Sequence, residues 1–301
     1  MAAPFAPLKQ DGRLNTGLIP EYFRFLRHNG VEGVFINGTT GEGTSLTLSE
    51  KKDIVRAWTD AGKSDSRFRI INLVGGTSVV ECAELAGFSA TMGVSAIALM
   101  APYYIKPSTV SLLGGFIGAV AAGVPETPVY FYHIPSLTGV NFPMIGLLEY
   151  ALAGIPNFAG IKYTHDDLMD FHKCLVFDGG RYDIFWGRDE TLLSALVLGA
   201  RGAVGSTYNY AAPLYREIIS LFTEGKIEQA RRLQLKSVDM VSVLARYGGI
   251  GAGKAFMKYA GIDCGKFRLP VASMSDQDFA GFREEVSSLE MAEFLSQKPA
   301  I

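Results

Sequence analysis

The clearest indication of the fold lies in residues 128–164, PVYFYHIPSLTGVNFPMIGLLEYALAGIPNFAGIKYT. This stretch begins and ends with short apolar runs rich in β-branched and aromatic residues, PVYFYHIP (128–135) and FAGIKYT (158–164), which are typical of strands. Between them, MIGLLEYALAG (144–154) has apolar residues at helical spacing. A strand, a helix and a second strand in this order form a right-handed unit with two parallel strands. The apolar runs are continuous rather than alternating, which indicates strands buried on both faces.

The same alternation extends along the chain in both directions. Further strand-like runs lie at 33–37, 69–76, 96–102, 183–187 and 202–206, and a shorter run at 2–8 makes eight. Segments with helical spacing lie between them, among them 50–58, 83–93 and 191–200. Eight parallel strands can close into a barrel, so we predict an α/β fold of the (β/α)8 TIM barrel type rather than an open sheet.

From Ala211 onward the pattern is helical, as in PLYREIISLF (213–222) and IEQARRLQLKSVDMVSVLARY (227–247). No linker or low-complexity segment separates this part from the rest. We therefore predict a barrel with the active site over residues 1–210 and a C-terminal helical extension over 211–301, packed on the barrel.

Composition excludes several classes of protein. The 301 residues are 48% hydrophobic and 19% charged, and the net charge of −2 leaves no electrostatic footprint for nucleic acid or an anionic membrane. The N-terminal residues MAAPFAPLKQDGRLN lack the basic and apolar regions of a secretory signal, which favours a cytoplasmic protein. The uncharged stretch 107–125 contains four glycines and starts with polar residues, so we expect a helix buried against protein, within the subunit or at a subunit contact.

The cysteines predict no disulfide and no metal site. Cys82, Cys174 and Cys264 lie far apart, form no CxxC pair and have no histidine at metal-ligand spacing. We expect buried, reduced thiols.

The loop NGTTGEG (37–43) follows the run at 33–37, where the active site of a barrel is expected. Glycines expose backbone amides and the two threonines add hydroxyl donors, which suits an anion the size of a carboxylate. A tight strand-to-helix turn without a ligand explains the sequence equally well. The order GxxGxG does not favour a dinucleotide site. Thr47 and Glu50 predict a capping box that begins the next helix.

Lys162 is the most informative single residue, because it interrupts an otherwise uncharged strand run. Burial disfavours the ammonium form of a lysine, and a neutral amine can attack a ketone to give a protonated Schiff base. A lysine at a strand end whose amine reaches water is the alternative. Tyr132 ends the preceding strand run and could reach groups bonded to Lys162, since neighbouring strands lie about 5 Å apart. Its phenol could relay a proton, although an aromatic residue here could equally be core.

Two further runs end in polar residues, GRDE (187–190) and GSTYN (205–209). Carboxylates and hydroxyls at a pocket rim suit a polyhydroxylated substrate. Asp189 and Glu190 could instead form a metal site, although no histidine is close in sequence, or favour the N-terminus of the next helix.

Other motifs carry weaker signals. Residues 248–254 match GxxxxGK, but Ala255 replaces the Ser or Thr that would hold magnesium, and the preceding segment is helical rather than a strand. The histidines at 28, 165 and 172 are expected on or near helices, at the surface or in packing. His133 follows Tyr132 and could line the pocket.

Six motifs in register over about 200 residues resemble the N-acetylneuraminate lyase and dihydrodipicolinate synthase family: GVFINGTTGEGTSLTLSEKK (33–52), APYYIKPS (101–108), YFYHIPSLTG (130–139), GIKYT (160–164), FWGRDE (185–190) and GAVGSTYN (202–209). The resemblance implies a (β/α)8 barrel with C-terminal helices, usually a homotetramer. It also implies class I aldolase chemistry on pyruvate through a lysine Schiff base, without a metal or an organic cofactor.

The resemblance also implies roles for individual residues. Lys162 matches the Schiff-base lysine and Tyr132 the proton-relay tyrosine, while Thr39 and Thr40 match the hydroxyl pair that holds the pyruvate carboxylate and completes the relay. The positions that match the pocket and the binding site for the hydroxylated tail of a sugar acid are Thr164, Gly187, Asp189, Glu190 and Ser206.

Leu137 separates the two branches of the family. In the synthase branch an arginine stands at this position and binds the carboxylate of the aldehyde substrate, so a leucine favours the lyase branch, which cleaves N-acetylneuraminate to N-acetylmannosamine and pyruvate. The pair Tyr103 and Tyr104 is synthase-like, and Tyr104 matches a tyrosine that reaches a neighbouring subunit's site. Another 2-keto-3-deoxy sugar acid, a synthase-like condensation, or a non-catalytic binding protein are the alternatives.

Overall fold

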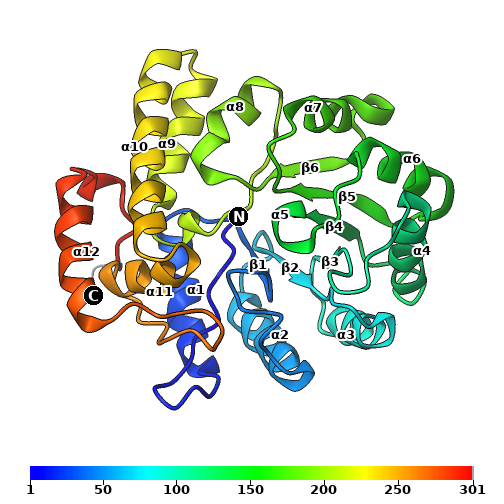
Figure 1. The fold of residues 1–301 in the computed structure, drawn as a ribbon, viewed down its shortest axis with the longest axis horizontal. Coiled ribbons are helices and arrows are strands. Elements are labelled where there is room, and N and C mark those ends of the chain that lie inside the picture. Colours follow the sequence, from blue (N-terminus) through cyan, green and yellow to red (C-terminus); the bar gives the residue numbers. More distant parts are fainter. Residues whose placement is uncertain (300–301) are drawn as a thin grey trace.

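The computed structural model describes residues 1–299, and six parallel strands form its sheet (Figure 1). The strands are hydrogen-bonded in the order of the sequence: β1 (Gly33–Ile36), β2 (Arg69–Leu73), β3 (Ala96–Met100), β4 (Val129–His133), β5 (Phe158–Tyr163) and β6 (Asp183–Trp186). Helices connect them: α2 (Leu48–Gly62), α3 (Val79–Thr91), α4 (Val110–Ala121), α5 (Pro135–Thr138), α6 (Met144–Gly154) and α7 (Leu168–Val176). The predicted βα alternation is confirmed for these six strands.

The prediction of regular strands at 2–8 and 202–206 is wrong, because both segments form only isolated bridges. Ala2 is bridged in parallel to Val34 and to Gly205, and Ala203 is bridged in parallel to Trp186. Prolines inside 2–8 lack the N–H that a ladder needs, and glycines inside 202–206 weaken a strand.

Backbone hydrogen bonds nevertheless connect the two outer strands through these segments. Val204 N donates to Trp186 O at 2.9 Å, and Ala3 N donates to Gly205 O at 2.9 Å. Phe35 N then donates to Ala2 O at 2.8 Å. β6 is thus linked to β1 through two short extended segments, and the N-terminus lies near the centre of Figure 1 beside β1.

Both faces of the sheet are buried, as the continuous apolar runs predicted. On one face, side chains such as Phe35, Ala98 and Val204 pack against one another in a single buried cluster. The other face packs against the helices through side chains such as Ile97 and Ile161.

The uncharged stretch 107–125 contains α4, one face of which is buried against protein as expected. Its residues Leu113, Ile117 and Val120 are fully buried. At Gly114 an added Cβ would lie 2.3 Å from the Tyr150 ring on α6, so glycine allows the two helices to approach closely. Among the described residues, no helix is long and apolar enough to cross a membrane.

The C-terminal part is helical, and no β-strand occurs between residues 211 and 299. Before it, η3 (Asp189–Thr191) and α8 (Leu192–Val197) follow β6, and η4 (Thr207–Asn209) follows the bridged segment. The main helices of this part are α9 (Ala212–Thr223), α10 (Ile227–Arg246), α11 (Ile250–Tyr259) and α12 (Asp276–Ser288). Figure 1 shows them together on one side of the sheet with α1 (Ile19–His28), opposite α4 and α6.

Candidate active site

A cavity of about 310 Å³ lies at the carboxyl ends of the strands, where barrel active sites are expected. Nine of the ten predicted site residues line this cavity, and only Tyr104 does not. These nine are Thr39, Thr40, Tyr132, Lys162, Thr164, Gly187, Asp189, Glu190 and Ser206. They come from five separate stretches of sequence, which the strand order brings to one end of the sheet.

Lys162 lies on β5 directly opposite Tyr132 of β4, because the two residues pair in the parallel register. Its side chain lies on the same face of the sheet as Phe35 and Tyr132, and the residue is only 4% exposed. The amine lies 4.0 Å from the centroid of the Tyr132 ring and 4.2 Å from that of Phe35. No carboxylate of residues 1–299 lies within 4.0 Å of it. The expectation that Lys162 is buried beside Tyr132 is therefore confirmed, and its amine lines the cavity.

The loop with Thr39 and Thr40 folds tightly after β1. Asn37 and Glu42 both have positive φ, at 56° and 54°, which is uncommon for residues other than glycine. The Asn37 amide donates to Asn72 Oδ1 of β2 at 2.8 Å. At Gly43 an added Cβ would lie 1.9 Å from the carbonyl oxygen of Asn37, so the loop requires glycine there. The capping box predicted at the start of α2 is confirmed.

Asp189 lines the cavity, and only one of its two carboxylate oxygens has a hydrogen-bond partner among residues 1–299. Its Oδ2 accepts hydrogen bonds from the Thr207 backbone N–H at 2.9 Å and the Thr207 hydroxyl at 2.6 Å. Its Oδ1 has no partner within residues 1–299. Burial raises the pKa of Asp189 to about 6, against the effect of the two bonds from Thr207.

A chain of hydroxyls holds Asp189 in this orientation. The Thr207 hydroxyl donates its proton to Asp189, so the Tyr215 hydroxyl, 2.6 Å away on α9, must donate to Thr207. Tyr215 lies in turn 2.8 Å from the Ser237 hydroxyl on α10. Helices of the C-terminal part thus orient a side chain that lines the cavity.

The neighbouring residues complete a polar rim. Glu190 accepts from Arg188 at 3.1 Å and 3.2 Å. The hydroxyl of Thr164 is buried without a partner, and at Gly187 an added Cβ would lie 1.9 Å from it. Two oxygens at this rim, Asp189 Oδ1 and Thr164 Oγ1, are thus buried without a hydrogen-bond partner among residues 1–299.

No metal centre emerges from the acids and thiols. In the part of the chain that the structure describes, no three His, Cys, Asp or Glu side chains group as metal ligands, so the two-acid metal site is not supported. Cys82, Cys174 and Cys264 are free and buried as expected, and burial raises the pKa of each thiol.

One sequence expectation is placed differently by the structure, while the role of Tyr104 in a neighbouring subunit's site stays a prediction. His133 does not line the cavity. It is buried on the helix side of β4, 5.0 Å from the Tyr163 ring centroid, and burial and His165 lower its pKa to about 3. Tyr104 is 86% exposed and lies outside the cavity.

Leu137 lies beside a second cavity of about 380 Å³, together with Tyr103 and Met100. This mainly apolar cavity shares Thr39 with the first. Leu137 brings no charge to this cavity.

Sequence reasoning missed the part of the cavity wall that the C-terminal helices supply. Leu244 and Ala245 of α10, and Ile250 and Gly253 of α11, line it. Leu244 and Ala245 belong to a segment with helical spacing, and Ile250 and Gly253 belong to the GxxxxGK match. Neither pattern indicates which surface these residues face.

The chain belongs to the Dihydrodipicolinate synthetase family, which matches residues 1–289. A Homo sapiens relative named N-acetylneuraminate lyase is 38% identical over 304 residues, covering 99% of this chain and 94% of the relative. A Gallus gallus relative of the same name is 37% identical, covering 96% of this chain and 95% of the relative. Among solved structures, Proteus mirabilis N-acetylneuraminate lyase matches with a TM-score of 0.92 at 35% identity, covering 96% of this chain and 97% of that chain.

Proposed function

We propose that this chain is a class I, Schiff-base aldolase that reversibly cleaves N-acetylneuraminate to N-acetylmannosamine and pyruvate. The observation that carries the proposal is the buried amine of Lys162, which lies among aromatic rings in the cavity without a carboxylate partner among residues 1–299. The names of full-length relatives at 37–38% identity support the same substrate.

The proposed chemistry begins at the Lys162 nitrogen. The neutral amine attacks the C2 ketone of the open-chain sugar acid, and loss of water gives an iminium. The iminium accepts the electron pair of the C3–C4 bond as the C4 hydroxyl loses its proton to Tyr132, with Thr40 completing the relay. N-acetylmannosamine leaves as the aldehyde, the enamine is protonated at C3, and water releases pyruvate. No metal or organic cofactor takes part in this proposal.

The proposed binding roles follow from the two sides of the cavity. Thr39 and Thr40 hold the carboxylate of the pyruvyl part beside Lys162. The hydroxylated tail extends toward the polar rim, where the Asp189 carboxyl accepts a hydrogen bond from one of its hydroxyls. The rest of this binding site consists of Thr164, Gly187, Glu190 and Ser206.

We further propose that the six strands and the two bridged segments together form a (β/α)8 barrel over 1–210, with 211–301 as its helical extension. The backbone hydrogen bonds from β6 through Val204 and Ala2 to β1 support closure of the barrel. The proposal includes a cytoplasmic homotetramer in which Tyr104 reaches a neighbouring site. The exposure of Tyr104 and the adjacent Ile105 supports a subunit contact there.

A pyruvate-release assay with N-acetylneuraminate, run on wild type and Lys162→Ala, tests the proposal. Wild type should release pyruvate, and Lys162→Ala should not. With pyruvate and borohydride, wild type should gain one stable adduct at Lys162. Lys173→Ala, which removes an exposed lysine of α7, is the matched control and should behave as wild type.

Two results would count against this function. An adduct that persists in Lys162→Ala would remove the assigned nucleophile. Turnover of a shorter 2-keto-3-deoxy acid, with none of N-acetylneuraminate, would change the substrate and keep the chemistry.

A further inference from the structure

The loop that carries Thr39 and Thr40 needs support from outside itself. Two of its residues, Asn37 and Glu42, adopt positive φ without being glycine, and such conformations persist only where surrounding contacts enforce them. The contacts that hold the Glu42 end come from the C-terminal part of the chain, more than 200 residues away.

Glu42 forms a buried ion pair with Lys254 of α11. Its Oε1 accepts from the Lys254 amine at 2.6 Å, and the two side chains are only 2% and 3% exposed. Its Oε2 accepts from the backbone N–H of Arg268 at 2.8 Å. The amine of Lys254 also donates to the carbonyl oxygen of Lys266 at 3.0 Å. Both oxygens of Glu42 and the charge of Lys254 are therefore satisfied without water.

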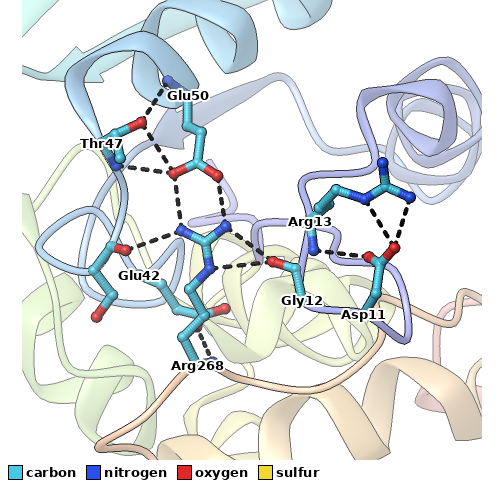
Figure 2. Close-up of polar contacts among 8 residues, drawn as sticks. Asp11, Gly12, Arg13, Glu42, Thr47, Glu50 and Arg268 are labelled. Carbon is cyan, nitrogen blue, oxygen red and sulfur yellow. Dashed lines mark hydrogen bonds and ion pairs between the residues drawn. The ribbon is translucent and has the colours of Figure 1, made fainter.

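Arg268 secures the far end of the same segment (Figure 2). Its guanidinium forms a two-bonded pair with Glu50, at 2.5 Å and 2.8 Å, and donates to the carbonyl oxygens of Gly12 and Ser45. Glu50 is the acid of the capping box with Thr47. The segment from Glu42 to Glu50 is thus fixed at both ends by residues 254–268.

We infer that Lys254, Glu42 and Arg268 are positioning residues, through which the C-terminal segment sets the location of Thr39 and Thr40. None of the three lines the cavity that contains Lys162. The ion pair also gives a role to the lysine of the GxxxxGK match: it anchors the loop after β1. This inference rests on the proposed function, since it assigns the supported loop to the substrate carboxylate.

Breaking the ion pair between Glu42 and Lys254 should weaken the binding of pyruvate more than the binding of N-acetylmannosamine. Removing the Lys254 amine leaves the Glu42 carboxylate buried and unpaired, so the loop must move to solvate it. A displacement of about 1 Å at a binding group can cost on the order of a hundredfold in rate or affinity. The polar rim around Asp189 is held separately, by Thr207 and Tyr215. Binding of pyruvate should therefore weaken while binding of the aldehyde does not.

The test measures synthesis from pyruvate and N-acetylmannosamine in wild type, Lys254→Met and Glu42→Gln. We expect the KM for pyruvate to rise at least about tenfold in each variant, with the KM for N-acetylmannosamine changed less than about twofold. In the double variant Glu42→Gln/Lys254→Met, the rise should be smaller than the product of the single effects, because no charge is left unpaired. Lys258→Met, on the exposed face of the same helix, is the matched control and should leave both KM values unchanged.

Each outcome decides the inference. Equal changes in both KM values, or a fall in kcat alone, would overturn it. If Lys254→Met or Glu42→Gln fails to fold, Glu50→Gln, which breaks the partly exposed pair with Arg268, takes its place. This variant must also raise the KM for pyruvate more than the KM for N-acetylmannosamine. Failure of wild type to trap pyruvate at Lys162 would instead refute the proposed function, so the two failures are distinguishable.

Discussion

The buried carboxyl of Asp189 predicts a specific dependence of stability on pH, which the substitution Asp189→Asn isolates. Burial raises the pKa of this group to about 6 in the folded protein, against an ordinary value of 3.8. The folded chain therefore binds the proton more tightly than the unfolded chain. The stabilisation is complete below about pH 3.8 and is lost as pH rises through about 6.

The magnitude follows from the two pKa values. One pKa unit corresponds to about 1.4 kcal/mol, so the difference between 3.8 and about 6 gives about 3 kcal/mol in all. Roughly 2 kcal/mol of this should appear between about pH 7.5 and about pH 4.5, where the folded group takes up its proton and the unfolded group largely does not. Asparagine keeps the size of the side chain and an oxygen for Thr207, but it takes up no proton.

The assay is denaturant unfolding of wild type and Asp189→Asn across this pH range, at one protein concentration so that assembly does not contribute. The unfolding free energy of wild type minus that of the variant should increase by roughly 2 kcal/mol as pH falls. Asp60→Asn, which removes an exposed carboxylate on α2, controls for the general effect of surface charge. If the unfolding free energies of wild type and Asp189→Asn change with pH in parallel, or if their difference grows toward high pH, folding does not raise the pKa of Asp189.

Two further substitutions test the site and the fold. In Gly205→Ala the new Cβ would lie 1.6 Å from Asp189 Oδ1, so turnover of N-acetylneuraminate should fall by at least about tenfold, while pyruvate still forms its adduct at Lys162; loss of the adduct as well would contradict a local effect. Thr109→Ala removes the hydroxyl that accepts from Leu112 N at the start of α4, so the unfolding free energy should fall by about 1 kcal/mol without a change in KM. An unchanged unfolding free energy would show that this cap is not stabilising.

The sequence predicted the six regular strands because each is buried on both faces, which leaves a continuous apolar run. The segments at 2–8 and 202–206 have the same apolar character, yet their prolines and glycines limit them to single bridges. Composition alone cannot show how many ladder bonds such a segment forms. The bonds depend on whether the neighbouring outer strands approach closely enough.

The site residues on strands could be predicted because parallel strands end together at one edge of the sheet. The same geometry shows why His133 was misplaced. Successive side chains of a strand point to opposite faces, so Tyr132 in the cavity requires His133 to face the helices. The walls supplied by α10 and α11 could not be found, since their position depends on how the helices dock.

Two buried lysines show why burial alone does not identify the proposed nucleophile. Lys162 and Lys254 are 4% and 3% exposed. Burial lowers the pKa of Lys254, while the carboxylate oxygen of Glu42, 2.6 Å from the amine, opposes this shift and occupies the amine with a structural contact. The amine of Lys162 lies against the rings of Phe35 and Tyr132, with no carboxylate of residues 1–299 in ion-pair range. An amine that is held by a carboxylate and a carbonyl oxygen cannot approach a ketone, so the lysine that lines the cavity without such partners is the one free to react.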